Sequence, residues 1–337
     1  MARLRHAPHI GLLIYPHAQL AAVHGLTDLF GVAARLTRER LRTEDSVLRV
    51  SHLGHDMAGD EISCLFDTQA GREGEPDIVI LPPSLGDPPG GDAIAPLVAW
   101  LRARHAGGTA LASVCAGAFL LAETGLLSGR TATTHWIYAE ALADRFPQIR
   151  VDADKLLIDD GDIITAGGLM AWTDLGLKLV DRLLGPTAMI ETARFLLVDP
   201  PGREQRYYSA FSPRLTHGDA AVLKVQHWLQ ANGTRGMTVG AMAVQAGLEE
   251  RTFLRRFSAA TGLRPIEYCQ HLRVGKARAM LEGTNKPIDQ IGWDVGYEDP
   301  ASFRKLFLKL TGLSPGDYRR RFGATRMSVS RSPRSDE

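Results

Sequence analysis

A duplicated segment in the second half of the chain limits the possible folds more than any other feature. GLEERTFLRRFSAATGLRPIEY (247–268) and GYEDPASFRKLFLKLTGLSPGDY (296–318) follow one pattern, and the second copy begins about fifty residues after the first. Each copy has two phenylalanines four positions apart, then Thr-Gly-Leu, then a proline and a tyrosine. A short apolar stretch that ends in glycine precedes each copy, at 238–247 and 287–296. The repeat therefore predicts a helical unit that occurs twice.

A short helix, a turn at glycine and a second helix with exposed cations form a helix-turn-helix, whose second helix enters the major groove of DNA. The two phenylalanines of each copy share one helix face and are expected in the core. The remaining positions predict the DNA contacts: Arg251, Thr252, Leu254 and Arg255 in the first copy, and Ala301, Ser302, Arg304 and Lys305 in the second. The alternative is a helical bundle whose repeat reflects packing alone. Arg or Lys at the same register in both copies argues against that alternative.

The distribution of charge separates the chain into two halves. Residues 217–337 contain 19 Lys and Arg against 12 Asp and Glu, a net charge of +7, whereas residues 1–216 carry a net charge of −6. A basic half joined to an acidic half is typical of a chain whose basic part meets a polyanion. Charge alone leaves an uneven solvated surface as an equal alternative, so the repeat decides between them.

The first half alternates short apolar runs with amphipathic stretches. HIGLLIY (9–15), VLRVSHL (47–53), DIVILPP (77–83) and TALAS (109–113) have the composition of buried parallel strands. Between them lie helical patterns such as 91–105, and a DG turn within 155–168 predicts a hairpin. This order predicts a flavodoxin-like α/β domain, with a parallel sheet and helices on both faces.

Four segments follow from these patterns. Residues 1–197 are predicted to form the α/β domain, and residues 198–219, rich in Pro, Gly, Arg and Tyr, a linker. Residues 220–322 are predicted to form an all-α domain with two helix-turn-helix units, and residues 323–337 a disordered tail.

A lone cysteine stands where α/β hydrolytic enzymes present a nucleophile. Cys115 follows the strand 109–113 and precedes a helical stretch, so it is expected on a sharp turn at a helix N-terminus, where the dipole lowers a thiol pKa. His135 follows the strand-like TATT, and we expect it to reach the thiol from an adjacent strand end. A Cys–His pair is the minimum for an activated nucleophile.

Both halves resemble known families. The stretch PIDQIGWDVGYEDPASFRKLFLKLTGLSPGDYRRRF is similar to the DNA-binding domain of the AraC/XylS family. That resemblance covers 220–322 and implies two helix-turn-helix units, joined by a long helix at 266–284, in successive major grooves. Pro300 and Ala301 depart from the polar residues that many members carry there.

SVCAGAFLLAETGLLSGRTATTHW (113–136) resembles the PfpI/ThiJ-like branch of the class I glutamine amidotransferase fold. The combination of the two halves is similar to the GlxA group of transcriptional regulators. The resemblance implies a domain that senses small polar metabolites, such as amino acids and quaternary amines.

The position that matches the acid of the catalytic relatives holds Ala22, and neither Asp28 nor Asp174 clearly replaces that acid. Three interpretations of Cys115 stay open: a ligand-pocket residue in a sensor without catalysis, a small buried hydrophobe, and a true nucleophile. We favour the first, with an effector pocket formed by Cys115, Ala116, His135 and Asp28, and with Cys115 and His135 as vestigial catalytic residues. The rival function is a cysteine-dependent amidase or hydratase with an appended DNA-binding module.

Composition also bears on disulfides, membrane spans and bound metals. The three cysteines are far apart and suggest no disulfide framework, which fits a reducing cytoplasm. No apolar run approaches the roughly 18 residues of a membrane span. The pair His52 and His55 only weakly suggests a metal, so we expect neither metal nor cofactor. The expected partners are double-stranded DNA, a small-molecule effector, a second copy of the chain and, as an option, RNA polymerase.

Overall fold

A computed structural model of the chain describes residues 7–55, 61–91, 94–200, 202, 204–209 and 211–323. It divides into two units, the first ending at Gln205 and the second beginning at Arg206. Apart from Gly323, the tail predicted at 323–337 lies outside the described residues.

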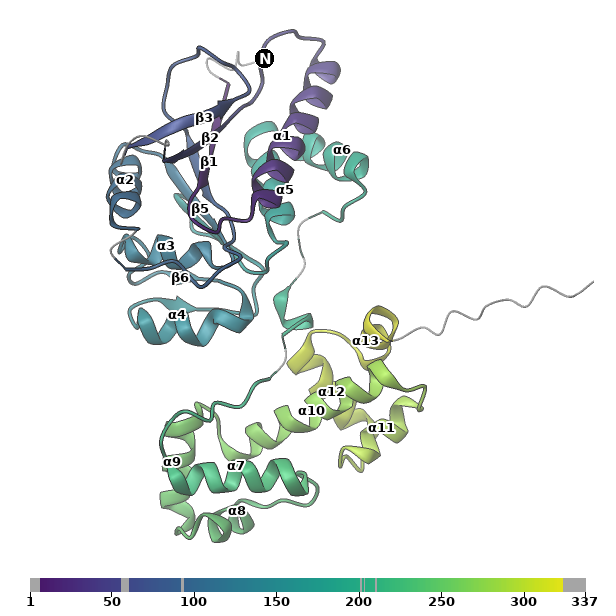
Figure 1. Cartoon of the computed structure of the whole chain (residues 1–337). Helices are drawn as coiled ribbons and strands as arrows, with labels where there is room; N and C mark the ends of the chain where they lie inside the picture. Colours follow the sequence, from purple (N-terminus) through teal and green to yellow (C-terminus); the bar gives the residue numbers. More distant parts are fainter. Residues whose placement is uncertain are drawn as a thin grey trace, which may run out of the picture. The chain divides into compact units, whose positions relative to one another are not determined.

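Unit 1 is built on a sheet of seven strands in the order β3-β2-β1-β4-β5-β9-β8 (Figure 1). The interior strands run parallel, which confirms the predicted parallel core, and the edge strands β3 and β8 run antiparallel to their neighbours. The predicted hairpin is formed by β8 and β9, whereas β3 was not predicted. The strands are β1 (His9–Ile14), β2 (Arg49–His55), β3 (Ile62–Asp67), β4 (Ile78–Leu81), β5 (Ala110–Val114), β8 (Leu157–Asp159) and β9 (Ile163–Ala166).

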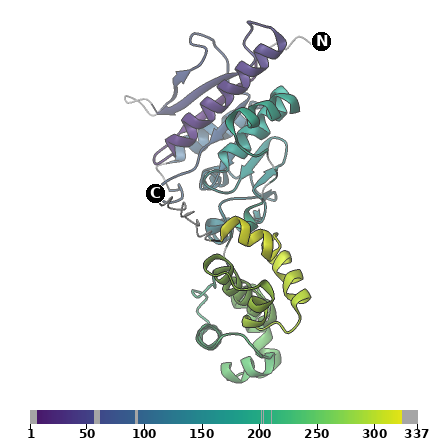
Figure 2. The ribbon, with the colours of Figure 1, turned by 90° about the vertical axis from the view of Figure 1, so that its right-hand side faces the viewer.

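Side chains alternate between the two faces of this sheet, and each face has its own core. Ile10 and Ile80 pack with α1, α5 and α6 on one face, whereas Leu13 and Leu81 pack with α2, α3 and α4 on the other. Figure 2 shows α1 (purple) beside α5 and α6 (teal) on their common face. These helices are α1 (Leu20–Leu41), α2 (Ala95–Ala106), α3 (Gly117–Glu123), α4 (Ala139–Arg145), α5 (Trp172–Leu184) and α6 (Pro186–Leu196). Helices on both faces confirm the predicted architecture.

Two very short strands, β6 (Thr131–Ala132) and β7 (Arg150–Val151), pair with each other outside the main sheet. The sequence suggested that the strand-like TATT before His135 extends the main sheet beside β5. It does not, because within the described residues β6 pairs only with β7.

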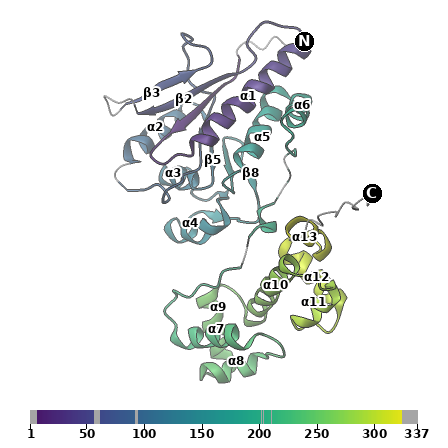
Figure 3. The same cartoon turned by 45° about the vertical axis from the view of Figure 1, so that its right-hand side comes forward.

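All the regular secondary structure described in unit 2 is helical, as predicted. Its helices are α7 (Ala220–Asn232), α8 (Val239–Ala246), α9 (Glu250–Thr261), α10 (Pro265–Gly283), α11 (Ile288–Asp294), α12 (Pro300–Thr311) and α13 (Pro315–Phe322). One core joins α7, α8, α9 and the first half of α10, and a second joins the rest of α10 to α11, α12 and α13 (Figure 3). The long helix α10 thus belongs to both cores and connects the two helix-turn-helix units.

Within the described residues, no helix combines the length and the apolarity needed to cross a bilayer.

Candidate DNA interface and candidate effector pocket

The first helix-turn-helix is formed by α8 and α9, and local sequence explains each of its ends. The Thr238 side chain caps α8 by accepting a hydrogen bond from the Ala241 amide, and Gly247 ends it in the left-handed conformation at φ 68°. Phe253 and Phe257 are fully buried, so the face of α9 opposite to them points to solvent. This face is the candidate recognition surface.

Two of the three arginines of α9 are available to contact DNA, and the third is bound within the protein. Arg256 binds Asp219, the residue that caps α7, with its Nε 2.8 Å from Oδ2 and its Nη2 2.7 Å from Oδ1. Arg251 and Arg255 are exposed and make no hydrogen bond or ion pair with any residue that the structure describes. Thr252 is half-buried and Leu254 is exposed beside them. The exposed side of α9 therefore presents two guanidinium groups one turn apart.

The second recognition helix, α12, has the same packing and different exposed chemistry. Phe303 and Phe307 are buried as in α9, while Ala301 and Lys305 are exposed. Ser302 is also exposed, but its hydroxyl donates to Oδ2 of the helix cap, Asp299, at 2.6 Å.

Two exposed cations of α12 differ in their contacts. The Arg304 guanidinium forms an ion pair with Asp289 on α11, with Nη2 2.5 Å from Oδ1. Lys305 forms no hydrogen bond or ion pair with any other described residue, so among the predicted DNA contacts it is the available cation of α12.

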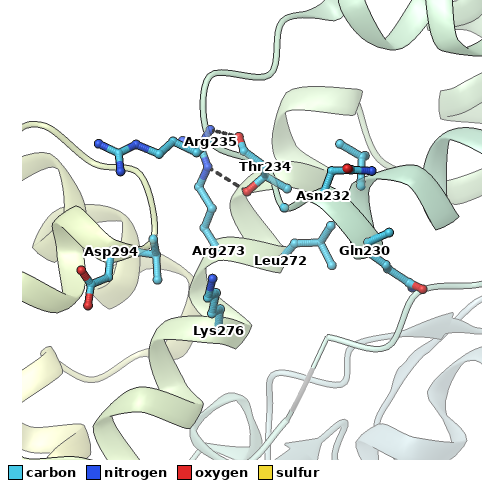
Figure 4. Close-up of a pocket in the computed structure, with 12 residues that line it drawn as sticks. Gln230, Asn232, Thr234, Arg235, Leu272, Arg273, Lys276 and Asp294 are labelled. Carbon is cyan, nitrogen blue, oxygen red and sulfur yellow. Dashed lines mark hydrogen bonds between the residues drawn. The ribbon is translucent and has the colours of Figure 1, made fainter.

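A cavity of about 580 Å³ lies where the two helix-turn-helix units meet (Figure 4). On its wall, Arg273 of α10 donates from Nε to the Thr234 hydroxyl at 3.1 Å and from Nη2 to the Thr234 carbonyl at 2.5 Å. The same guanidinium lies over the Tyr297 ring, 5.4 Å from its centroid. Arg273 therefore connects the loop before α8 with the turn before α12.

In unit 1, Cys115 follows the carboxyl end of the interior strand β5, on the predicted sharp turn. Its φ of 55° is unusual for a residue other than glycine, and its side chain is only 2% exposed. The turn packs closely against the end of β4, because a Cβ at Gly117 would lie 2.6 Å from the Leu81 carbonyl oxygen. Cys115 thus lies on a sharp turn between β5 and α3, as the sequence predicted.

The expectation that the helix dipole lowers the thiol pKa is wrong. Burial raises the pKa of the Cys115 thiol to about 11, and the opposing hydrogen bond from the Ala116 amide does not compensate. The helix that follows has only seven residues, so little dipole is available to stabilise a thiolate. At neutral pH Cys115 is a protonated thiol.

His135 lies three residues after the end of β6 and next to Thr134, whose hydroxyl donates to the Cys115 carbonyl oxygen at 2.8 Å. The Nδ1 atom of His135 accepts the Ile137 amide at 3.1 Å, and burial lowers the pKa of the imidazole. A neutral imidazole whose Nδ1 accepts a hydrogen bond carries its proton on Nε2. His135 therefore offers a donor to a ligand.

The other two predicted pocket residues differ in burial. Ala116 is fully buried beside Cys115, whereas Asp28 is exposed on α1. Ala22 is also fully buried on α1, so an alanine methyl group occupies the place that the resemblance assigns to an acid. Asp174 is buried at the start of α5 and receives a hydrogen bond from the Thr173 hydroxyl at 3.3 Å.

Gln205, which falls in the predicted linker, was not predicted as a site residue. Gln205 is 2% exposed, and its Nε2 lies 2.8 Å from the Thr134 carbonyl, 3.0 Å from the Lys155 carbonyl and 3.0 Å from the Thr133 hydroxyl. Its Oε1 accepts the Trp136 amide at 3.2 Å. The last residue of unit 1 is therefore bound to both sides of His135. A polar residue in an aperiodic stretch offers no sequence signal of such a contact.

His52 and His55 both lie in β2. His52 is buried and hydrogen-bonded to the Thr27 hydroxyl at 2.8 Å, with the Phe66 ring on its other side. No group of three or more metal-ligating side chains occurs among the described residues.

Comparison with known families assigns each unit a match. Residues 242–321 match the helix-turn-helix domain family, and residues 46–182 match the DJ-1/PfpI family.

Among curated proteins, the HTH-type transcriptional regulator GlxA of Rhizobium meliloti is 30% identical over 220 residues, which cover 64% of this chain and 67% of the relative. The HTH-type transcriptional regulator CdhR of Pseudomonas aeruginosa is 28% identical over 229 residues, 67% of this chain and 68% of the relative. An isonitrile hydratase of Pseudomonas putida is 32% identical over 115 residues, 32% of this chain and 47% of the relative. A solved AraC family transcriptional regulator from Pseudomonas putida has a TM-score of 0.44 and 22% identity, covering 56% of this chain and 99% of that chain.

Proposed function

The chain belongs to the GlxA-type transcriptional regulators of the AraC/XylS family, and on this premise we propose that unit 1 senses a small polar metabolite beside Cys115 without converting it. DNA binding by the helix-turn-helix domain is the activity of the family. The observation that carries the proposal is the buried, protonated thiol of Cys115, and the Nε2 donor of His135 supports it.

The geometry supports binding over turnover. A nucleophilic cysteine needs a thiolate or a base that takes its proton. Burial keeps the Cys115 thiol protonated, and the lone pair of His135 Nδ1 already accepts the Ile137 amide. Ala22 supplies no acid. A ligand with acceptor groups, such as the carboxylate of an amino acid or of a carboxylated quaternary amine, fits the donors that remain.

Gln205 supports a route from this pocket to the rest of the chain. Its amide binds the backbone at Thr134 and Trp136, on either side of His135, and the peptide that follows it begins unit 2. A ligand that shifts His135 changes the hydrogen bonds of Gln205, and with them the point at which the chain leaves unit 1. Binding then biases the states that hold DNA, because a ligand shifts a population by its different affinity for each state.

Three further elements complete the proposal. The regulator works in the cytoplasm, it acts as a homodimer, and its DNA-bound form contacts RNA polymerase to change transcription.

A direct test is calorimetric titration of the full chain with L-arginine, choline, glycine betaine and carnitine. We expect at least one compound to bind, His135→Ala to weaken that binding, and Cys64→Ser, which alters an exposed cysteine, to leave it unchanged. The bound compound should stay chemically intact by NMR. Consumption of a compound that Cys115→Ser abolishes would instead establish the amidase or hydratase function, and no binding by any compound would refute this ligand class.

A further inference from the structure

The two recognition helices have matching cores and unequal exposed cations. When Phe253 is aligned with Phe303, Arg251 corresponds to Ala301, and Arg255 corresponds to Lys305. We propose that the first helix-turn-helix specifies the DNA sequence through two guanine contacts, while the second positions the protein on the backbone without a guanine requirement. This inference rests on the DNA-binding function and deepens it.

The geometry of α9 fits direct readout of two bases. Arg251 and Arg255 are one helical turn apart, exposed, and without an ion pair to any described residue. The adjacent Arg256 is bound to Asp219 and does not compete for the groove. A free guanidinium donates two parallel hydrogen bonds to O6 and N7 of guanine, which is the commonest specific contact in the major groove. Each of the two side chains therefore selects one guanine.

The exposed groups of α12 do not repeat this chemistry. The Ala301 methyl group has no hydrogen-bonding capacity and suits only an apolar contact such as a thymine methyl. Asp299 holds the Ser302 hydroxyl, and Asp289 holds the Arg304 guanidinium. The remaining cation, Lys305, is a flexible point charge that suits a phosphate better than a planar base edge. The second helix thus supplies affinity with little sequence information.

The contact between the two helix-turn-helix units explains how α12 contributes to DNA binding. Arg273 binds Thr234 and covers Tyr297, so the positions of α9 and α12 within unit 2 are coupled. Once α9 has selected its bases, α12 is carried to a groove at a constant separation, about one turn of DNA away. A phosphate contact at that distance adds affinity regardless of sequence.

Selection of the full chain on a library of randomised 30-base-pair duplexes at near-physiological salt tests the inference. We expect an enriched motif with two strongly selected guanines in one segment and a weakly specified segment about one turn away. Arg255→Ala should remove the preference at one guanine, with a loss of about 5- to 150-fold on the selected site. Arg255→Lys should keep the charge and relax the same position.

Two matched variants separate the roles of the helices. Lys305→Ala should weaken binding to all sequences alike and leave the motif unchanged, with a shallower dependence on salt. Ala301→Arg, which places a guanidinium where α9 has Arg251, should add a selected guanine to the second segment. Two equally informative segments, or a motif altered by Lys305→Ala and untouched by Arg251→Ala and Arg255→Ala, would overturn the inference. If no sequence is enriched at all, sequence-specific DNA binding itself fails, and the inference fails with it.

Discussion

Replacing Gln205 by alanine tests whether the Gln205 side chain binds the end of unit 1 to the backbone on either side of His135. The side-chain amide is buried, it accepts one N–H, and it has two N–H groups that it shares among three acceptors. Two donated bonds and one accepted bond, at about 1 kcal/mol each, give about 3 kcal/mol for opening this contact. The loss is local because the segment is the last of its unit.

Amide hydrogen exchange at Trp136 measures this opening, since its N–H donates to Gln205 Oε1. We expect exchange at this amide to accelerate by about 100-fold in Gln205→Ala, in line with about 3 kcal/mol. Glu204→Gln is the matched control: Glu204 binds the half-exposed Lys155 at 2.8 Å, and such surface pairs contribute about 0–1 kcal/mol. Equal exchange in the wild type and in Gln205→Ala would show that the contact does not form in solution, and the coupling argument would lose its basis.

Three other predictions concern the thiol, an ion pair and the sharp turn. Iodoacetamide at pH 7.5 should alkylate exposed Cys64 well before Cys115, whose thiol is buried with a raised pKa, and peptide mass spectrometry gives the order. Early labelling of Cys115 would indicate an activated thiol. The Arg256 guanidinium lowers the pKa of Asp219, so this pair stabilises unit 2 at neutral pH and ceases to do so as the pH falls through the lowered pKa. Urea unfolding at pH 7 and pH 3 should therefore show a smaller pH effect in Arg256→Met, and an unchanged pH effect would exclude this pair as its source. Gly117→Ala places a methyl group against a carbonyl oxygen of β4 and should lower the Tm of unit 1 by several degrees, about 1–3 kcal/mol, while an unchanged Tm would contradict the close packing of this turn.

Periodicity explains which parts of the fold were predictable. The interior strands β1, β4 and β5 are buried on both faces, so their sequences are mostly apolar runs that stand out from their surroundings. The edge strand β3 is partly exposed along its whole length, and ISCLFD shows neither such a run nor a clean alternation. A repeat is easier still to detect, because Phe253 and Phe303 occupy equivalent core positions.

The chemistry of the sites was less accessible from sequence, because it depends on contacts between distant residues. Nothing near Arg256 in the sequence shows that Asp219, 37 residues away, withdraws it from the DNA surface. The position of Cys115 on its turn was predictable, but its pKa was not, since burial by many side chains outweighs the short helix that follows. Gln205 is bound to residues about 70 positions earlier in the chain, a distance over which composition says nothing.

Sequencing of genomic DNA fragments captured by the purified full chain at near-physiological salt tests the central claim most directly. Phosphate contacts alone give binding that weakens steeply with added salt, so retention at this salt demands specific contacts. The account predicts enrichment at a few discrete sites that share a motif, and loss of that enrichment in the double variant Arg251→Ala, Arg255→Ala. Featureless capture that disappears as salt is added, with no difference between the wild type and the double variant, would contradict it.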